Sequence, residues 1–148
     1  MNDLKTKLGA IVVACLLMTT VQAQSLQGKW TVEKVTIEKN TDGKVETTVY
    51  DSAAAVQSHI PCLQELEVNA QTITLRYPDG WEEVAEFIID GSQLEVMTAI
   101  ATQLYQYSKS STTLTLTATY NYVNNNLAAK TSAKITEIRT ITLKMNEQ

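Results

Sequence analysis

The sequence is poor in cysteine, proline and histidine, and each shortage excludes something. Its 148 residues include two cysteines, two prolines and one histidine, His59. One histidine cannot build a His-rich metal site, and we find no His-based triad. A nucleophile pair of Cys62 and His59 is conceivable, but no oxyanion-stabilising or orienting group accompanies it. We therefore expect neither catalysis nor a cofactor.

Basic residues are in the minority. The chain has 12 lysines and arginines against 16 aspartates and glutamates, which gives a formal net charge of −4. No cluster of Lys or Arg offsets this excess. Nucleic acids and anionic lipid surfaces attract positive patches, so the composition argues against both as partners.

Long apolar runs are confined to the N-terminus. Lys5 and Lys7 precede the apolar stretch Leu8–Val21, which is too short to span a bilayer with margin. The stretch Val21-Gln22-Ala23 then supplies small residues at both recognition positions of a signal-peptidase site. This order is typical of an export signal that is cleaved after Ala23.

The sequence therefore predicts a signal peptide over residues 1–23 and one domain over residues 24–148, with no transmembrane span in the mature chain. The mature protein is expected in the periplasm or outside the cell. A competing interpretation uses Val12-Val13-Ala14-Cys15, which resembles a bacterial lipobox and would anchor the protein through a lipid on Cys15.

Cys62 is the one cysteine in the predicted mature chain, so no intramolecular disulfide can form there. A lone thiol in an exported protein is usually a small buried hydrophobe, which is what we expect. A reactive or intermolecular Cys62 is the alternative. The oligomeric state does not follow from the sequence.

Alternation of apolar and polar residues dominates from Gly28 onward, with turn residues about every eight to twelve positions. The apolar positions change from even-numbered residues (Trp30 and Val32) to odd-numbered ones (Val35 and Ile37) near Glu33 and Lys34. This change predicts a bulge in the first strand. Asp51–Ile60 is the one segment with helical character, and Pro61 ends it. Further strands are expected over Lys44–Tyr50, Leu63–Asn69, Thr72–Tyr77, Trp81–Ile89, Leu114–Tyr122 and Ile135–Met145, with shorter ones at Leu94 and Val96 and around Leu104–Tyr107.

Short turns join these strands, which favours consecutive neighbours, and closure of the sheet removes both exposed edges. We expect an all-β fold, an up-and-down antiparallel β-barrel of eight or nine strands with one short helix. An eight-stranded barrel is either filled by side chains or holds one small ligand. The candidate ligand-binding residues of the interior are Tyr77, Trp81, Phe87, Leu114, Leu116, Tyr120 and Tyr122.

Gly28-Lys29-Trp30 resembles the Gly-X-Trp element of lipocalins. The resemblance implies that Trp30 plugs the closed end of the barrel and that Arg139, from the last strand, packs across its indole ring. The order of motifs over residues 26–145, including "PCLQELEVNAQTITLRYPDGW" and "SSTTLTLTATY", is similar to small lipocalin-like (calycin) domains exported by Bacteroidetes-type bacteria. It implies a barrel that binds a small hydrophobic ligand.

Two other functions stay open. The same interior residues could form a filled barrel that serves as an interaction or structural module of the cell envelope. A more distant possibility is an enzyme that uses the barrel mouth. Several carboxylates could be taken for a calcium site, but alternation scatters them, and a solvated negative patch is the expectation. These residues are Glu65, Glu67, Glu82, Glu83 and Glu86.

Overall fold

The structure, a computed structural model, describes residues 26–146. The predicted signal peptide and the alternative lipid attachment at Cys15 lie outside these residues. The described chain forms nine strands and one 3-10 turn, η1. Their bounds are β1 Gly28–Thr41, β2 Lys44–Tyr50, η1 Ala53–Ala55, β3 Glu65–Val68, β4 Thr72–Arg76, β5 Glu82–Asp90, β6 Gln93–Met97, β7 Thr102–Lys109, β8 Thr113–Asn126 and β9 Thr131–Met145. No helix in this part of the chain has the length and apolarity to cross a membrane.

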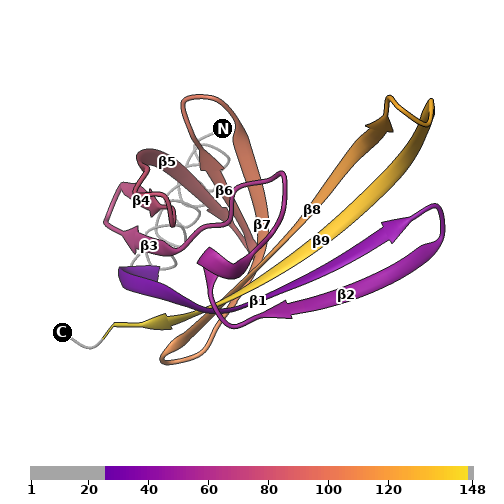
Figure 1. Cartoon of the computed structure of the whole chain (residues 1–148). Helices are drawn as coiled ribbons and strands as arrows, with labels where there is room; N and C mark the ends of the chain where they lie inside the picture. The colour runs from indigo at the N-terminus through magenta and orange to yellow at the C-terminus, as the bar shows by residue number, and fades with distance from the viewer. Residues whose placement is uncertain (1–25, 147–148) are drawn as a thin grey trace, which may run out of the picture.

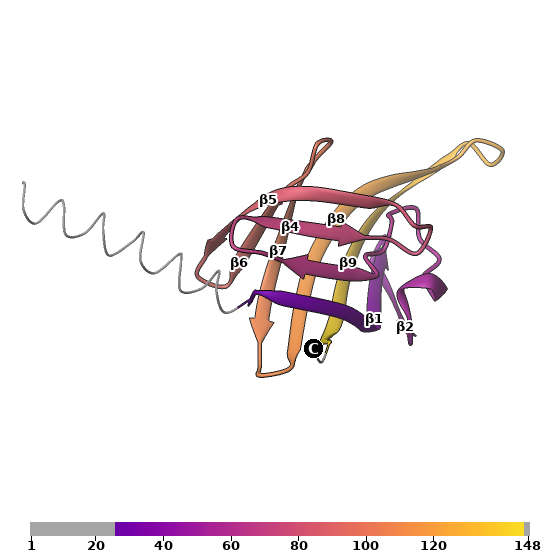
Figure 2. The ribbon, with the colours of Figure 1, turned by 90° about the vertical axis from the view of Figure 1, so that its left-hand side faces the viewer.

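The sheet closes into a barrel. Strands β3 to β9 each pair antiparallel with the next, and β9 returns to pair with β1 along most of its length. Figure 2 shows the start of β1 with β3, β4 and β5 crossing in front of β7, β8 and β9 at a steep angle, as opposite walls of a barrel do. The prediction of an all-β, antiparallel, eight-stranded barrel is confirmed, and β2 is one extra strand.

The extra strand arises because β2 and β3 share one edge of β1. Residues 44–50 pair with the second half of β1, and residues 65–68 pair with its first half. The intervening residues 51–64, which we call the mouth segment, leave the sheet. Of the helical character predicted over Asp51–Ile60, one 3-10 turn, η1, is present; it extends no further, since Ser52 makes no side-chain cap bond and Val56 is already extended. A few alanines without caps cannot offset the cost of helix nucleation.

The bulge predicted near Glu33 and Lys34 is confirmed, since the register of β1 against β9 shifts between Val32 and Lys34. Beyond this bulge the β1–β2 and β8–β9 hairpins project together to one side of β3–β7 (Figure 1). The β1–β2 turn is Asp42-Gly43, with φ of 50° and 90°. Positive φ at both positions is typical of the two-residue turn that suits hairpin twist.

The core fills the barrel at the end where β1 begins and β9 finishes, which we call the closed end. Trp30 is fully buried there, and Leu114, Leu116, Ile73 and Leu143 are at most 2% exposed. Side chains of alternate residues from both walls meet in this layer, as close packing of a small barrel requires. The opposite end, between the β4–β5 and β6–β7 turns and the mouth segment, is the open end.

Candidate functional site

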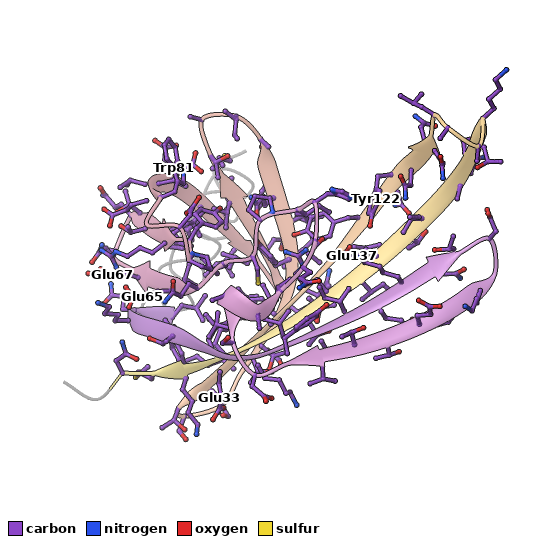
Figure 3. The ribbon with its side chains drawn as sticks, in the orientation of Figure 1. Glu33, Glu65, Glu67, Trp81, Tyr122 and Glu137 are labelled. Atoms are coloured by element: carbon purple, nitrogen blue, oxygen red, sulfur yellow. The ribbon has the colours of Figure 1, made fainter. Side chains whose placement is uncertain are left out.

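Two inward-facing residues of β9 carry opposite charges at the open end. Glu137 and Arg139 are 0% and 1% exposed, and Arg139 Nη2 donates to Glu137 Oε1 at 2.7 Å. The Tyr122 hydroxyl donates to Glu137 Oε2 at 3.1 Å, and Lys39 Nζ lies 3.7 Å from the same oxygen. Figure 3 shows Tyr122 and Glu137 where β8 and β9 leave the barrel. A buried charge is tolerated only when it is paired and hydrogen-bonded. Glu137 and Arg139 therefore hold each other, and the groups bonded to them, in fixed positions.

Arg139 ties the mouth segment to the barrel. Its Nη1 donates to the Pro61 carbonyl oxygen at 2.8 Å, and its Nη2 donates to the Ile60 carbonyl oxygen and to Ser58 Oγ, both at 3.1 Å. Arg139 Nε is the one buried side-chain nitrogen or oxygen within residues 26–146 without a partner. The planar guanidinium can bond several acceptors at once, which explains how a loop without regular structure is held across the barrel mouth.

The resemblance to lipocalins implied that Arg139 packs across Trp30, and this is wrong. Trp30 lies opposite Met145, whereas Arg139 lies opposite Ile37, several residues further along β1. The cation over the Trp30 ring is Lys109, with Nζ 5.8 Å from the ring centre. Trp30 Nε1 donates to the Leu26 carbonyl oxygen at 2.9 Å. Trp30 does occupy the closed end, but its cation comes from β7.

The cation of Arg139 lies over a different ring, that of Tyr120, at 5.5 Å from the ring centre. Tyr120 belongs to a group of tyrosines that includes Tyr105, whose hydroxyl donates to Gln103 Oε1. Burial raises the pKa of Tyr105 well above its ordinary value, and the nearby Tyr120 and Tyr77 add to the shift. Burial is also the main cause that raises the pKa of Tyr77 and Tyr120. All three phenols are therefore protonated at neutral pH and can donate hydrogen bonds.

A pocket of about 250 Å³ opens beside these tyrosines. Tyr77, Trp81 and Tyr120 supply aromatic surface, and Ile60 and Pro61 of the mouth segment add aliphatic surface. Trp81 is 63% exposed. Apolar surface with a few polar groups is the composition of small-molecule sites, although the volume is at the small end for them.

Two carboxylates complete this pocket, Asp79 from the β4–β5 turn and Glu83 from β5. Asp79 Oδ1 accepts from the Trp81 backbone N–H, and Glu83 Oε1 accepts from the Ala99 backbone N–H, both at 3.0 Å. These bonds orient the two turns that border the pocket. Neither carboxylate forms an ion pair within residues 26–146.

Two further pockets have different characters. One of about 570 Å³ lies between the mouth segment and β8 and includes His59 and Tyr122; it shares Ile60 and Tyr120 with the aromatic pocket. Another of about 700 Å³, at the closed end, is lined by no aromatic side chain of the described residues. The charged groups there, Lys29 and Glu67, are already in ion pairs with other residues.

The predicted ligand-binding residues divide into three groups. Tyr77, Trp81 and Tyr120 meet at the aromatic pocket, and Tyr122 lies in the neighbouring pocket. Leu114 and Leu116 are closed within the core, and Phe87 packs against it. Trp81 is not enclosed in the barrel interior as predicted: it lies one residue before β5, is 63% exposed and lines the pocket at the open end.

Sequence reasoning missed Glu137, Gln103 and Tyr105. Glu137 shares its parity with Arg139, Ile141 and Leu143, so its inward position could have been inferred from the same alternation. Gln103 and Tyr105 alternate with outward-facing neighbours in β7. The contribution of Ile60 and Pro61 carried no sequence signal, since it depends on the path of the mouth segment.

The other candidate chemical groups lie elsewhere. Cys62 is buried, as expected, and its thiol donates to the Leu63 carbonyl oxygen at 3.5 Å. Burial raises the pKa of this thiol, and the nearby Arg139 lowers it in part. His59 is exposed. Within the described residues, no group of three or more His, Cys, Asp and Glu side chains is arranged to hold a metal ion.

The carboxylates expected to form a solvated patch are partly organised around one cation. Arg76 bonds to Glu65 at 2.6 Å, to Glu67 at 2.9 Å and to Glu82 at 2.6 Å. Glu65 and Glu67 extend from the outer side of the barrel in Figure 3. This network links three neighbouring strands on the outer face, and Glu65, Arg76 and Glu82 line a separate pocket of about 180 Å³ that shares Tyr77 and Trp81 with the aromatic pocket.

Comparison with known proteins finds no matching family model, no matching curated protein and no matching solved structure.

Proposed function

We propose that the protein is an exported, lipocalin-like barrel without catalytic activity, which binds one small hydrophobic or amphipathic molecule at its open end. The observation that carries the proposal is the pocket at the barrel mouth, where Tyr77, Trp81 and Tyr120 gather beside the mouth segment. Large aromatic side chains exposed in a concave site are costly unless something covers them, which favours a binding role.

The lipocalin-like assignment rests on the closed barrel together with Gly28-Lys29-Trp30 on its first strand. Trp30 is buried at one end and covered by a cation, although the cation is Lys109. The filled closed half means that a ligand occupies only the open half. Export rests on the N-terminal sequence pattern.

The expected affinity is modest. Burial of about 150 Å² of apolar ligand surface contributes about 4 kcal/mol, at about 25 cal/mol per Å², before the cost of immobilising the ligand. Protonated phenols of Tyr77 and Tyr120 would add hydrogen bonds to polar groups of an amphipathic ligand. The dissociation constant should therefore be in the micromolar to millimolar range.

Titration with the neutral fluorescent probe N-phenyl-1-naphthylamine tests this proposal. Its emission should rise on binding and saturate. Ala101, an exposed residue of the β6–β7 turn, lines the pocket, and its side chain takes no part in the turn's hydrogen bonds. Ala101→Trp should fill the pocket and weaken probe binding about tenfold or more.

The matched control is Ala128→Trp, which adds the same side chain at the exposed tip of the β8–β9 hairpin. This variant should bind the probe as the unmodified protein does. Absence of saturable binding, or equal binding by both tryptophan variants, would contradict the proposal.

A second candidate function, an interaction module of the cell envelope, has its own observation. The outer edge of β2 is unpaired within the described residues, and Val45 and Val49 on this strand are more than half exposed. An open strand edge with apolar side chains can pair with a strand of a partner. Val49→Lys should abolish such pairing and leave probe binding unchanged, which separates the two functions.

A further inference from the structure

The charged groups of the aromatic pocket are all negative. Asp79 and Glu83 line it together with Tyr77, Trp81 and Tyr120, and no lysine or arginine among the described residues does. Glu83 faces the barrel interior, since it lies on β5 two residues before the buried Ala85. An inward carboxylate at a barrel mouth loses part of its hydration, and a cation that approaches it restores favourable electrostatics.

Within residues 26–146, no lysine or arginine forms an ion pair with either carboxylate. Each accepts one backbone N–H, which fixes its position without cancelling its charge. Arg139, whose guanidinium lies 5.5 Å from the Tyr120 ring centre, is paired with Glu137 at 2.7 Å and bonded to the mouth segment. A positively charged ligand would therefore meet two oriented and unpaired carboxylates.

The aromatic rings suit the same kind of ligand. Tyrosine and tryptophan rings attract cations through their faces, and quaternary ammonium groups are commonly held by several such rings. An ammonium carrying methyl groups buries apolar surface and carries a positive charge, so it matches both properties of this pocket. A metal ion would match the charge but not the aromatic surface, and a phosphate would match neither.

We propose that the open-end pocket of this barrel selects an organic ammonium ion, with Tyr77, Trp81 and Tyr120 around its alkyl groups and Asp79 and Glu83 beside its charge. This inference rests on the proposed ligand-binding function and specifies the chemical class of the ligand. It concerns this pocket alone and not the larger pockets beside β8 or at the closed end.

The test compares two probes of nearly equal shape, choline and its neutral isostere 3,3-dimethylbutan-1-ol. Isothermal titration calorimetry measures both affinities, and quenching of Trp81 emission locates the binding. Trp81→Phe provides the reference spectrum, since Trp30 is the one other tryptophan. Choline should bind about tenfold or more tightly than the alcohol.

The double variant Asp79→Asn/Glu83→Gln removes both charges but keeps an oxygen to accept each backbone N–H, so the turns stay in place. It should lower the choline affinity about tenfold and so remove most of the preference for choline over the alcohol. Glu86→Gln is the matched control, because Glu86 lies exposed on the outer face of the same strand as Glu83. It should change neither affinity.

The outcomes separate the two proposals. If choline and the alcohol bind equally, or choline does not bind while the naphthylamine probe does, the ammonium inference is overturned and the ligand-binding function stands. If the double variant binds choline as tightly as the unmodified protein, the carboxylates are not responsible and the inference is also overturned. If none of the three probes binds, both proposals fail.

Discussion

At the scale of single residues, the unusual feature is a fully buried ion pair in a small barrel. Glu137 and Arg139 alternate with Ile141 and Leu143 on the inner face of β9, so charge occupies positions where an apolar side chain would pack more simply. Such a pair seldom adds stability compared with apolar residues of similar volume. It does supply directed bonds, and here these reach Ser58, Ile60 and Pro61. The pair therefore determines where the mouth segment lies.

Glu137→Gln should destabilise the protein by about 3 kcal/mol, because it leaves Arg139 buried without its counter-charge while hardly changing the side-chain shape. Urea unfolding measures the loss. Adding Arg139→Met removes the remaining charge, so the double variant should be more stable than the sum of the single effects predicts, by about 1 kcal/mol or more.

The control for charge loss alone is Glu46→Gln, which breaks the exposed Lys44–Glu46 pair at 2.6 Å. It should leave the unfolding midpoint unchanged, since exposed pairs contribute little. Strictly additive effects of Glu137→Gln and Arg139→Met would show that the two charges do not depend on each other.

Individual residues also show how far alternation alone can predict a site. The inward direction of Tyr120, Tyr122 and Arg139 follows from parity within long strands. The aromatic ring that Arg139 contacts, Tyr120 and not Trp30, does not follow, because parity fixes the face of a strand but not its register against the neighbouring strands. Trp81 lies at the end of the β4–β5 hairpin, where its carbonyl oxygen accepts from the Tyr77 backbone N–H at 2.9 Å, and its side chain is 63% exposed although its parity is that of the inner face.

At the scale of elements, the mouth segment decides the shape of the site. It interrupts what would otherwise be one long strand alongside β1, and the Gln64 carbonyl oxygen accepts from the Val32 backbone N–H at 2.9 Å where pairing resumes. Its residues Ile60 and Pro61 form part of the aromatic pocket, whereas Cys62 and Leu63 are buried beneath. The segment thus connects core packing with the candidate site.

Arg139→Lys should release this segment while the barrel stays folded. Lysine keeps the charge but lacks the planar fork that bonds Ser58, Ile60 and Pro61 together. Hydrogen–deuterium exchange within residues 51–64 should accelerate about tenfold or more, with no change in β4–β6. The matched control is Arg76→Lys, an arginine on the outer face with three carboxylate partners. Faster exchange throughout the barrel would instead indicate general destabilisation.

The strands were predictable and the mouth segment was not. Alternating residues and the Asp42-Gly43, Asp79-Gly80 and Asp90-Gly91 turns indicate hairpins directly, because local chemistry sets their geometry. The mouth segment has helix-forming alanines but is placed by bonds to Arg139, which lies far away in sequence. Tertiary contacts override weak local propensity in such a segment.

At the scale of the whole molecule, closure of the barrel joins the first and last strands. The pairing of β1 with β9 extends from Trp30 to Thr41, so the ends of the described chain depend on each other. Sequence reasoning reached closure through the need to remove exposed strand edges. The outward projection of the β1–β2 and β8–β9 hairpins (Figure 1) follows from the bulge and from strand lengths that exceed those of β3–β7.

The contacts at the closed end predict which N-terminal residues the barrel needs for its stability. Leu26 is fully buried, and its carbonyl oxygen accepts the Trp30 Nε1 bond at 2.9 Å. A chain that starts at Gln24 keeps both contacts, whereas a chain that starts at Gly28 loses them. Loss of a buried leucine together with an unsatisfied indole N–H should cost about 4 kcal/mol and lower the thermal midpoint by about 10 °C or more.

Leu26→Ala in the chain that starts at Gln24 separates the two contributions. It removes the side chain but keeps the backbone carbonyl, so its thermal midpoint should fall between those of the two truncated chains. Differential scanning calorimetry of the three proteins gives the comparison. Equal midpoints for the chains that start at Gln24 and Gly28 would mean that Trp30 closes the barrel without help from the residues before it.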